Sequence, residues 1–256
     1  MKEVLLDPTP KDIRDAGSQF DKDNGVLEEA LGDLFRTYRD NTQPAQVFLK
    51  VTALNALYST QIPLYSTRIP TTRDVANHIV DIKVDSRIAQ GDPQVVYDIS
   101  KVDVPGKERR YYYSFATKFC SWHAQDSYPI FDSRVLAYLG HLRRNGRLGK
   151  FGQIDPWIYS KFKGIVMEFC EKNGLGEFNF KKIDKFLYLQ GGILIDGNER
   201  KKRELKEEEP ILAPALEQAG EMEWSVENYG SPEEAELSRK KFTDPGGWSV
   251  VNAKGE

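Results

Sequence analysis

The sequence predicts an all-α fold, and three observations support this class. Apolar residues recur at helical spacing along most of the first 190 residues, strongly alternating strands are scarce, and proline and glycine stand where helices would begin or end. With 256 residues and a hydrophobic fraction of 39%, the chain can form one large folded domain or two small ones. No apolar run approaches the roughly 20 residues that span a bilayer.

Two helices are expected near the N-terminus. The first carries an apolar stripe at positions i, i+3, i+4, i+7 and i+8, formed by Leu27, Ala30, Leu31, Leu34 and Phe35. The second begins at Pro44, with Thr42 or Gln43 as its cap, and runs through Leu57. Its sequence is too apolar for a surface helix.

Five further helices follow along the chain. They are expected over 72–82 with Thr72 as the cap, over 112–123, after Asp132, from Asp155 to Asn173, and over 180–189. Asp132 follows the break at Pro129 and directly precedes an apolar helical stretch, so it is predicted to cap that helix.

From about Arg200 the chain becomes polar and loses its apolar period. We therefore expect a helical domain over 1–199 and a polar, acidic, partly ordered extension over 200–256. Trp224, Tyr229, Phe242 and Trp248 suggest that part of the extension docks on the core.

The charge is distributed unevenly. Residues 101–206 hold 21 Lys and Arg against 12 Asp and Glu, although the whole chain has a net charge of −3. Such a basic region suits a polyanion, and a solvated lysine-rich face would have the same composition.

The N-terminus lacks a secretory signal, which predicts a cytoplasmic protein. The two cysteines, Cys120 and Cys170, are expected to be buried thiols, and neither metal nor cofactor is expected.

The most informative stretch is Tyr111–His123 followed by Tyr128–Val135. It resembles the core of the helix-hairpin-helix DNA glycosylases, in which a hairpin leads into a helix of small residues, a Pro-x-x-Asp loop and another helix. The resemblance implies two helical lobes beside a DNA-binding cleft, the central lobe over 42–148 and the second over 1–41 and 149–199. It also implies that Asp132 is the catalytic carboxylate, which stabilises the positive charge that develops on the deoxyribose.

In bifunctional members of this family, a lysine about 18 residues before the aspartate attacks the sugar. Here Ser114 stands at that position. The resemblance therefore implies a monofunctional enzyme that leaves an intact abasic site, and Lys118 would have to reach back by one helical turn to act as a nucleophile.

A weaker resemblance lies in Leu54–Ile62, where family members carry side chains that fill the gap left by the extruded nucleotide. Residues expected to contact DNA are Asn55, Tyr58 and Gln61 from this segment, Lys107, Arg109 and Arg110 from a hairpin at Val104–Arg110, and Arg134. The hairpin departs from the family pattern, because it has one glycine where the family has two.

Other candidates have ordinary structural interpretations as well. Tyr112 and Tyr113 could line a base pocket, and at least one of the tyrosines at 111–113 is expected in the core. Trp122 is a pocket candidate that could equally be a packed indole. An aspartate before a helix is, without its flanking pattern, more often only a cap.

The whole chain looks closest to relatives classed as glutamyl/putrescinyl-thymine pyrophosphorylases, and it resembles a phage-defence glycosylase that excises α-glucosyl-hydroxymethylcytosine. The predicted function is a monomeric, cofactor-free glycosylase that flips a modified base out of double-stranded DNA as an anti-phage defence. The alternatives are a transferase acting on hypermodified thymine and a non-catalytic DNA-binding module.

Overall fold

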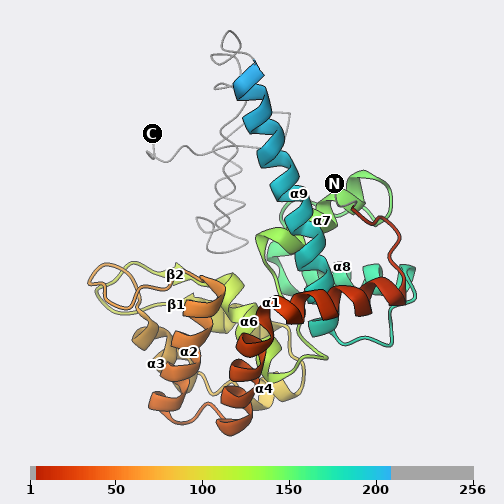
Figure 1. Cartoon of the computed structure of the whole chain (residues 1–256). Helices are drawn as coiled ribbons and strands as arrows, with labels where there is room; N and C mark the ends of the chain where they lie inside the picture. The colour runs from red at the N-terminus through yellow and green to blue at the C-terminus, as the bar shows by residue number, and fades with distance from the viewer. Residues whose placement is uncertain (1–3, 209–256) are drawn as a thin grey trace.

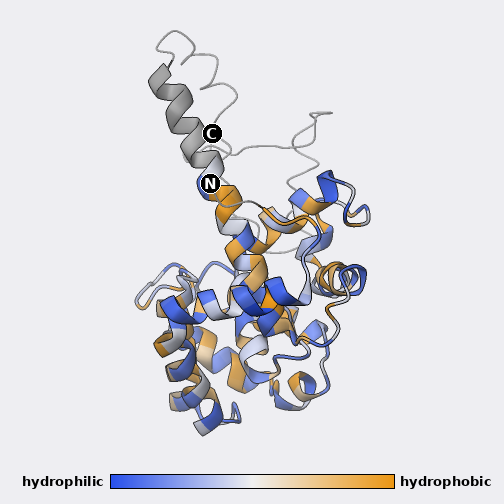
Figure 2. Ribbon diagram, turned by 45° about the vertical axis from the view of Figure 1, so that its right-hand side comes forward, coloured by the Kyte–Doolittle hydropathy of each residue, from blue (hydrophilic) through white to orange (hydrophobic). Residues whose placement is uncertain are grey.

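The computed structural model describes residues 4–208 of the chain, with side chains up to residue 197. This part is mostly helical and contains one two-stranded sheet, which confirms the predicted helical class. Hydrophobic and hydrophilic residues alternate along the helices (Figure 2), as expected of amphipathic helices around a core. None of the helices within 4–208 has both the length and the hydrophobicity needed to cross a bilayer.

The described elements have the following bounds. In chain order they are α1 (Pro10–Thr37), α2 (Pro44–Tyr58), α3 (Thr72–Asp81), α4 (Asp85–Ala89), α5 (Gln94–Ser100), β1 (Lys101–Val102), β2 (Arg110–Tyr111), α6 (Tyr113–His123), α7 (Ser133–Arg144), the 3-10 helix η1 (Asp155–Trp157), α8 (Tyr159–Lys172) and α9 (Phe180–Glu208).

The helices form two groups that α1 connects. Helices α2 to α6 and the two strands lie on one side of the molecule, and α7 to α9 lie on the other (Figure 1). Helix α1 packs against α9 at one side and against α2 and α6 at the other. Helix α7 falls within the range 42–148 that was expected to form the central lobe, but it packs extensively against α9.

Four of the described helices begin with a side-chain cap, and at α9 this cap is Asn179, whose Oδ1 accepts from the Lys182 N–H at 3.0 Å. Thr9 and Asp12 form a reciprocal capping box at α1, and Thr71 and Asp74 form one at α3. The cap of α3 is therefore Thr71, one residue before the Thr72 that was expected. Asp132 caps α7 as predicted, because its carboxylate accepts a hydrogen bond from the backbone N–H of Val135.

Two expected helices have different bounds. Asp155 and Pro156 open only the short 3-10 helix η1, and α8 begins at Tyr159 because the backbone at Ile158 is extended. Helix α9 continues beyond the expected end at residue 189 and crosses the boundary predicted at 199/200. The rest of the predicted C-terminal extension, residues 209–256, lies outside the described residues.

The segment between α5 and α6 is a β-hairpin. Strands β1 and β2 pair antiparallel, with Lys101 opposite Tyr111 and Val102 opposite Arg110. Gly106 lies in the turn with a φ of 80°, in the left-handed region that glycine adopts at little cost. The segment Val104–Arg110, where the hairpin of a helix-hairpin-helix motif was expected, thus forms the loop and part of the second strand of a short two-stranded ribbon.

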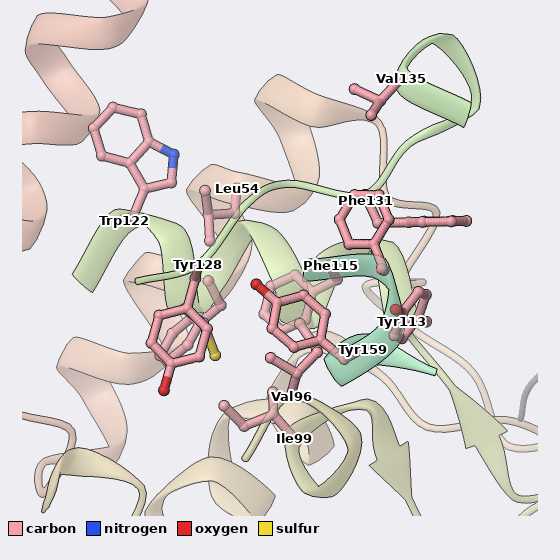
Figure 3. Close-up of a cluster of buried hydrophobic side chains, with 14 of the residues drawn as sticks. Leu54, Val96, Ile99, Tyr113, Phe115, Trp122, Tyr128, Phe131, Val135 and Tyr159 are labelled. Carbon is pink, nitrogen blue, oxygen red and sulfur yellow. The ribbon is translucent and has the colours of Figure 1, made fainter. Parts of the chain in front are cut away.

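The core contains a dense aromatic cluster behind the loop that precedes α7. Phe131 packs against Tyr113 and Phe162, with ring centroids 4.9 and 5.4 Å away. Figure 3 shows Phe131 beside Tyr113 and Tyr159, with Val135 at the start of the next helix. Because Phe131 is fully buried, this cluster fixes the backbone directly before Asp132.

Candidate active site

Asp132 lies half-buried at the N-terminus of α7. Its Oδ1 accepts from the Val135 N–H at 2.9 Å. The N-terminal end of a helix dipole interacts favourably with a negative charge. The carboxylate is therefore held in one position, at the end of a rigid element, with part of its surface accessible.

Helix α6 supports the loop that carries Asp132. The Thr117 hydroxyl accepts from the Phe131 N–H at 3.1 Å, and the Lys118 ammonium lies 3.5 Å from the Phe131 carbonyl oxygen. Lys118 also donates to the Ser114 hydroxyl at 2.6 Å. Ser114 and Lys118, both predicted from sequence, therefore share one hydrogen-bonded arrangement behind Asp132.

The Lys118 ammonium is almost completely buried, with 3% of the residue exposed. Burial lowers the pKa of Lys118, and the negative charges of Asp132 and Asp184 partly oppose that shift. The lowered pKa places the amine closer to its neutral form than an exposed lysine. Asp132 and Asp184 thus both act on this ammonium through their charge.

A second buried lysine joins α9 to α1 and α2. Lys181 lies 3.0 Å from a carboxylate oxygen of Glu28 and donates to the Tyr58 hydroxyl at 2.9 Å. The Trp122 indole N–H donates to the same hydroxyl at 3.2 Å, and the Lys181 ammonium lies 4.4 Å from the indole ring centroid. Lys185 forms an ion pair with the second oxygen of Glu28 at 3.3 Å.

We call this group the buried polar cluster. It consists of Glu28, Tyr58, Lys118, Trp122, Lys181, Asp184 and Lys185, which come from α1, α2, α6 and α9. Tyr58, Lys118 and Trp122 were candidates from sequence. The other four members were not. Lys181, Asp184 and Lys185 are charged residues within the apolar helical stretch 180–189, and Glu28 follows the first residue of the apolar stripe that begins at Leu27.

Asp184 is the least satisfied member of the cluster. Its residue is 7% exposed, and its Oδ1 has no hydrogen-bond partner among the residues that the structure describes. Burial raises the pKa of Asp184 to about 7, while the nearby charge of Lys181 lowers it and the charge of Asp132 raises it further. A carboxyl group in this position is stabilised in its protonated form.

The other pocket candidates have well-defined partners. The Tyr112 hydroxyl donates to the Pro70 carbonyl at 2.7 Å, and burial raises the pKa of Tyr112 to about 12. The Tyr113 hydroxyl donates to the Pro156 carbonyl at 3.0 Å inside the aromatic cluster. Tyr113 thus belongs to the core behind Asp132.

Two residues expected to contact DNA are used within the protein. The Asn55 side chain accepts from the Ile62 N–H at 2.9 Å and donates to the Ile62 carbonyl at 2.8 Å, which fixes the turn after α2. The Tyr58 hydroxyl points into the buried polar cluster. Their positions differ from those expected for side chains that fill a gap in the duplex, because hydrogen bonds inside the protein hold both of them.

Gln61, from the same segment, is exposed and has a φ of 58°. The turn places two large side chains at the surface nearby, since Leu64 is 49% exposed and Tyr65 is 87% exposed. Sequence reasoning did not single out either of them. Both follow Ile62, the residue to which the Asn55 side chain is hydrogen-bonded.

The basic residues of the hairpin are paired with acids. Lys107 lies 2.6 Å from Asp74, Arg109 lies 2.6 Å from Asp103, and Arg110 lies 3.3 Å from Glu108. The arginine pairs are about half-exposed, and such pairs contribute little to stability. These arginines can therefore exchange a carboxylate for a phosphate at low cost.

Arg134 lies on α7 two residues after Asp132. Its guanidinium carbon is 4.2 Å from the centroid of the Tyr188 ring on α9. This cation–π contact links α7 to the helix that carries Asp184. No group of three or more potential ligands in the described residues is arranged to hold a metal ion.

Comparisons with known proteins match about half of the chain or less. Residues 12–127 match the family described as HI_0787_N, N-terminal domain. An uncharacterized protein of Haemophilus influenzae is 38% identical over 129 residues, which are 50% of this chain and 61% of that protein. The chain therefore spans less than two thirds of the length of this relative. No solved structure matches the chain significantly. The family match includes Glu28, Tyr58 and Lys118 and ends before Asp132.

Proposed function

We propose that the protein is a monofunctional DNA base glycosylase of the helix-hairpin-helix type, with Asp132 as its catalytic carboxylate. The observation that carries this proposal is the half-buried Asp132 carboxylate, fixed at the N-terminus of α7 with Ser114 and Lys118 behind it. The described helices form two groups that α1 connects (Figure 1), and the proposal assigns these groups to the two lobes of the glycosylase fold. The sequence pattern from Tyr111 to Val135 supports the same assignment.

The proposed chemistry uses Asp132 as a fixed negative charge. When the bond between C1′ and the base nitrogen breaks, positive charge develops on the deoxyribose. A carboxylate that is already oriented stabilises this charge without reorganisation, and it can also orient the attacking water. Water then adds to C1′, and the product is an abasic site in an unbroken strand.

The proposed partner is double-stranded DNA, bound by a monomer. The arginines of the hairpin, Arg109 and Arg110, would bind phosphate groups. The exposed turn after α2 would contact the duplex where the nucleotide is extruded, through Gln61, Leu64 or Tyr65, because Tyr58 is held inside. The proposed target is a modified base such as glucosylated hydroxymethylcytosine, which would make the enzyme an anti-phage defence in the cytoplasm.

The deciding experiment is an abasic-site assay. The full-length protein is incubated with unmodified duplex DNA, with uracil-containing and mismatched duplexes, and with phage DNA that carries glucosylated cytosine or hypermodified thymine, and each sample is then treated with alkali. We expect alkali-dependent breaks with one class of DNA. Asp132→Asn should lower the rate by at least about 100-fold, as for the removal of one group that stabilises a transition-state charge.

Controls separate this proposal from its alternatives. Asp81→Asn, which removes an exposed carboxylate at the end of α3, should leave the rate unchanged. Breaks without alkali, together with borohydride trapping that Lys118→Met abolishes, would contradict the monofunctional assignment. Intact DNA on every substrate would overturn the glycosylase. Release of pyrophosphate would then favour the transferase. If Asp132→Asn left the affinity for DNA unchanged and no product were formed, the non-catalytic DNA-binding module would be favoured.

A further inference from the structure

Asp184 is a buried carboxyl group that the fold leaves without a partner for one of its oxygens. It lies on α9, one turn before Tyr188, and its Oδ1 accepts no hydrogen bond within the described part of the chain. A buried polar atom without a partner destabilises a fold, because no protein hydrogen bond replaces the one it makes with water in the unfolded chain. A group retained under that penalty commonly has a role with a ligand or a proton.

The neighbouring lysines do not provide the missing partner. The Lys118 ammonium donates to Ser114 and lies near the Phe131 carbonyl, and the Lys181 ammonium is bound by Glu28 and Tyr58. Both lysines act on Asp184 through their charge. The groups whose charges face Asp184 are Glu28 on α1, Lys118 on α6, Asp132 at the start of α7 and Lys181 on α9, and Tyr58 on α2 and Tyr188 on α9 also interact with it.

The two carboxyl groups near Lys118 are in contrasting environments. Asp132 is partly exposed, accepts a hydrogen bond from the Val135 N–H and lies at the N-terminus of α7. Asp184 is buried, lacks a donor to its Oδ1 and lies within the field of Asp132, all of which favour its neutral form. Pairs of carboxyl groups in such opposed environments divide the roles of base and acid.

We propose that Asp184 is the general acid of the reaction, which protonates the base as it leaves. This inference rests on the proposed glycosylase function. The bond between C1′ and the base nitrogen breaks, its electron pair moves onto the base, and the Asp184 carboxyl transfers its proton to a nitrogen or oxygen of that base. Water adds to C1′ and releases a proton to solvent, and Asp184 later takes a proton from solvent.

The packing of α7 against α9 keeps the two carboxyl groups in a fixed relationship. Gly191 on α9 contacts the backbone of α7 at Arg134, and the Arg134 guanidinium lies over the ring of Tyr188. Asp132 and Asp184 lie close to these two contacts along their helices. The proposed role requires that the leaving base be bound between the start of α7 and the buried polar cluster.

The first test is the pH dependence of single-turnover excision, measured on the duplex that the wild-type protein cleaves in the abasic-site assay. Because the acid must be protonated, we expect the wild-type rate to fall about tenfold per pH unit above neutral pH. Asp184→Asn should react at least about 100-fold more slowly, with a rate that no longer falls over that range. Asp81→Asn should retain the wild-type profile.

The second test does not depend on activity. Infrared difference spectra of the protein without DNA, recorded at pH 5.5 and pH 9, should contain the band of a protonated carboxyl group that Asp184→Asn removes. Asparagine resembles protonated aspartate in size, and a circular dichroism melt verifies that the variant is folded. Absence of that band overturns the proposal.

The outcomes distinguish the two levels of inference. If the wild-type protein produces no abasic sites on any DNA, both the glycosylase and the role of Asp184 are refuted. If the wild-type protein is active and Asp184→Asn keeps its rate and pH profile, only the role of Asp184 is refuted. A merely structural role for Asp184 would lower the stability of the variant without changing the shape of its pH profile.

Discussion

Asp132 has an observed role as a helix cap and a proposed role in catalysis, and the two roles depend on different properties of its side chain. As the cap of α7 it needs an oxygen that accepts from the Val135 N–H, and asparagine provides an equivalent oxygen. In the proposed reaction it needs a negative charge near C1′, which asparagine lacks. The two functions can therefore be separated by substitution at this single residue.

We expect Asp132→Ala to lower the free energy of unfolding by about 1 kcal/mol, because the cap is lost. Asp132→Asn should stay within about 0.5 kcal/mol of the wild-type protein, because the cap is retained. Urea unfolding at neutral pH measures both values. If Asp132→Asn were as unstable as Asp132→Ala, a loss of glycosylase activity in the asparagine variant would report on folding and not on charge.

At the scale of elements, the contact between α7 and α9 depends on one glycine. A Cβ atom built on Gly191 would overlap the backbone carbonyl of Arg134, which cannot move without displacing α7. Gly191 thus permits the close approach of the two helices that carry Arg134 and Tyr188. On the same helix, a Cβ on Gly197 meets nothing within 4 Å.

These two glycines form a matched pair for mutation. We expect Gly191→Ala to destabilise the protein by about 1–3 kcal/mol, as overpacking in a core does. Gly197→Ala should be neutral or stabilise by up to about 1 kcal/mol, since alanine is the better helix former and space is available. Thermal unfolding followed by circular dichroism compares them, and equal melting temperatures would show that α7 and α9 are not in close contact.

The sequence predicted helices best where apolar spacing and caps coincide. The cap at Asp132 was found because an apolar helical stretch follows it directly. The start of α1 at Pro10 was not found, although Thr9 and Asp12 have the spacing of a capping box, because the apolar stripe was recognised only from Leu27. The length of α9 was missed because Gly191 and Gly192, directly after the expected end, are poor helix formers, and because the residues beyond 197 are polar.

At the scale of the whole molecule, the candidate site combines residues that local patterns link with residues that only the fold brings together. Asp132, Ser114 and Lys118 lie within a short segment, so one motif identified all three. Glu28 and Asp184 are separated from that segment by other helices and join it because α1 and α9 pack together. No local pattern predicts that contact, since burial of a charged residue depends on partners distant in sequence.

The same distribution of buried groups determines how the stability of the whole protein depends on pH. His123 is largely buried beside Phe35 and Phe119. Its burial, and to a smaller extent the positive charge of Lys50, lower its pKa to about 3. An unfolded histidine has a pKa near 6.5, so the unfolded state binds the proton more readily. The stabilising effect of a neutral His123 is therefore complete above pH 6.5 and is lost progressively as the pH falls toward 3.

Asp184 has the opposite effect, because its pKa is raised. Its contribution to stability is complete below the pKa of an unfolded aspartate, near 3.9, and is lost as the pH rises toward 7. The two contributions partly cancel between pH 4 and pH 7, so the wild-type protein alone should show a shallow dependence. Replacing one of the two groups is required to reveal the other.

We expect His123→Gln, which keeps a polar group beside Asn41, to become more stable relative to the wild-type protein as the pH falls. The difference in unfolding free energy between the two proteins should change by about 2 kcal/mol from pH 7.5 to pH 5. Over this range His123 of the wild-type protein takes up a proton only in the unfolded state, and the variant has no such group. Urea unfolding at several pH values measures this difference, and parallel stability curves for the two proteins would contradict a buried neutral histidine. The His123→Gln variant should also lose stability from pH 4 to pH 7, because Asp184 is still present. The double variant with Asp184→Asn should lack this loss.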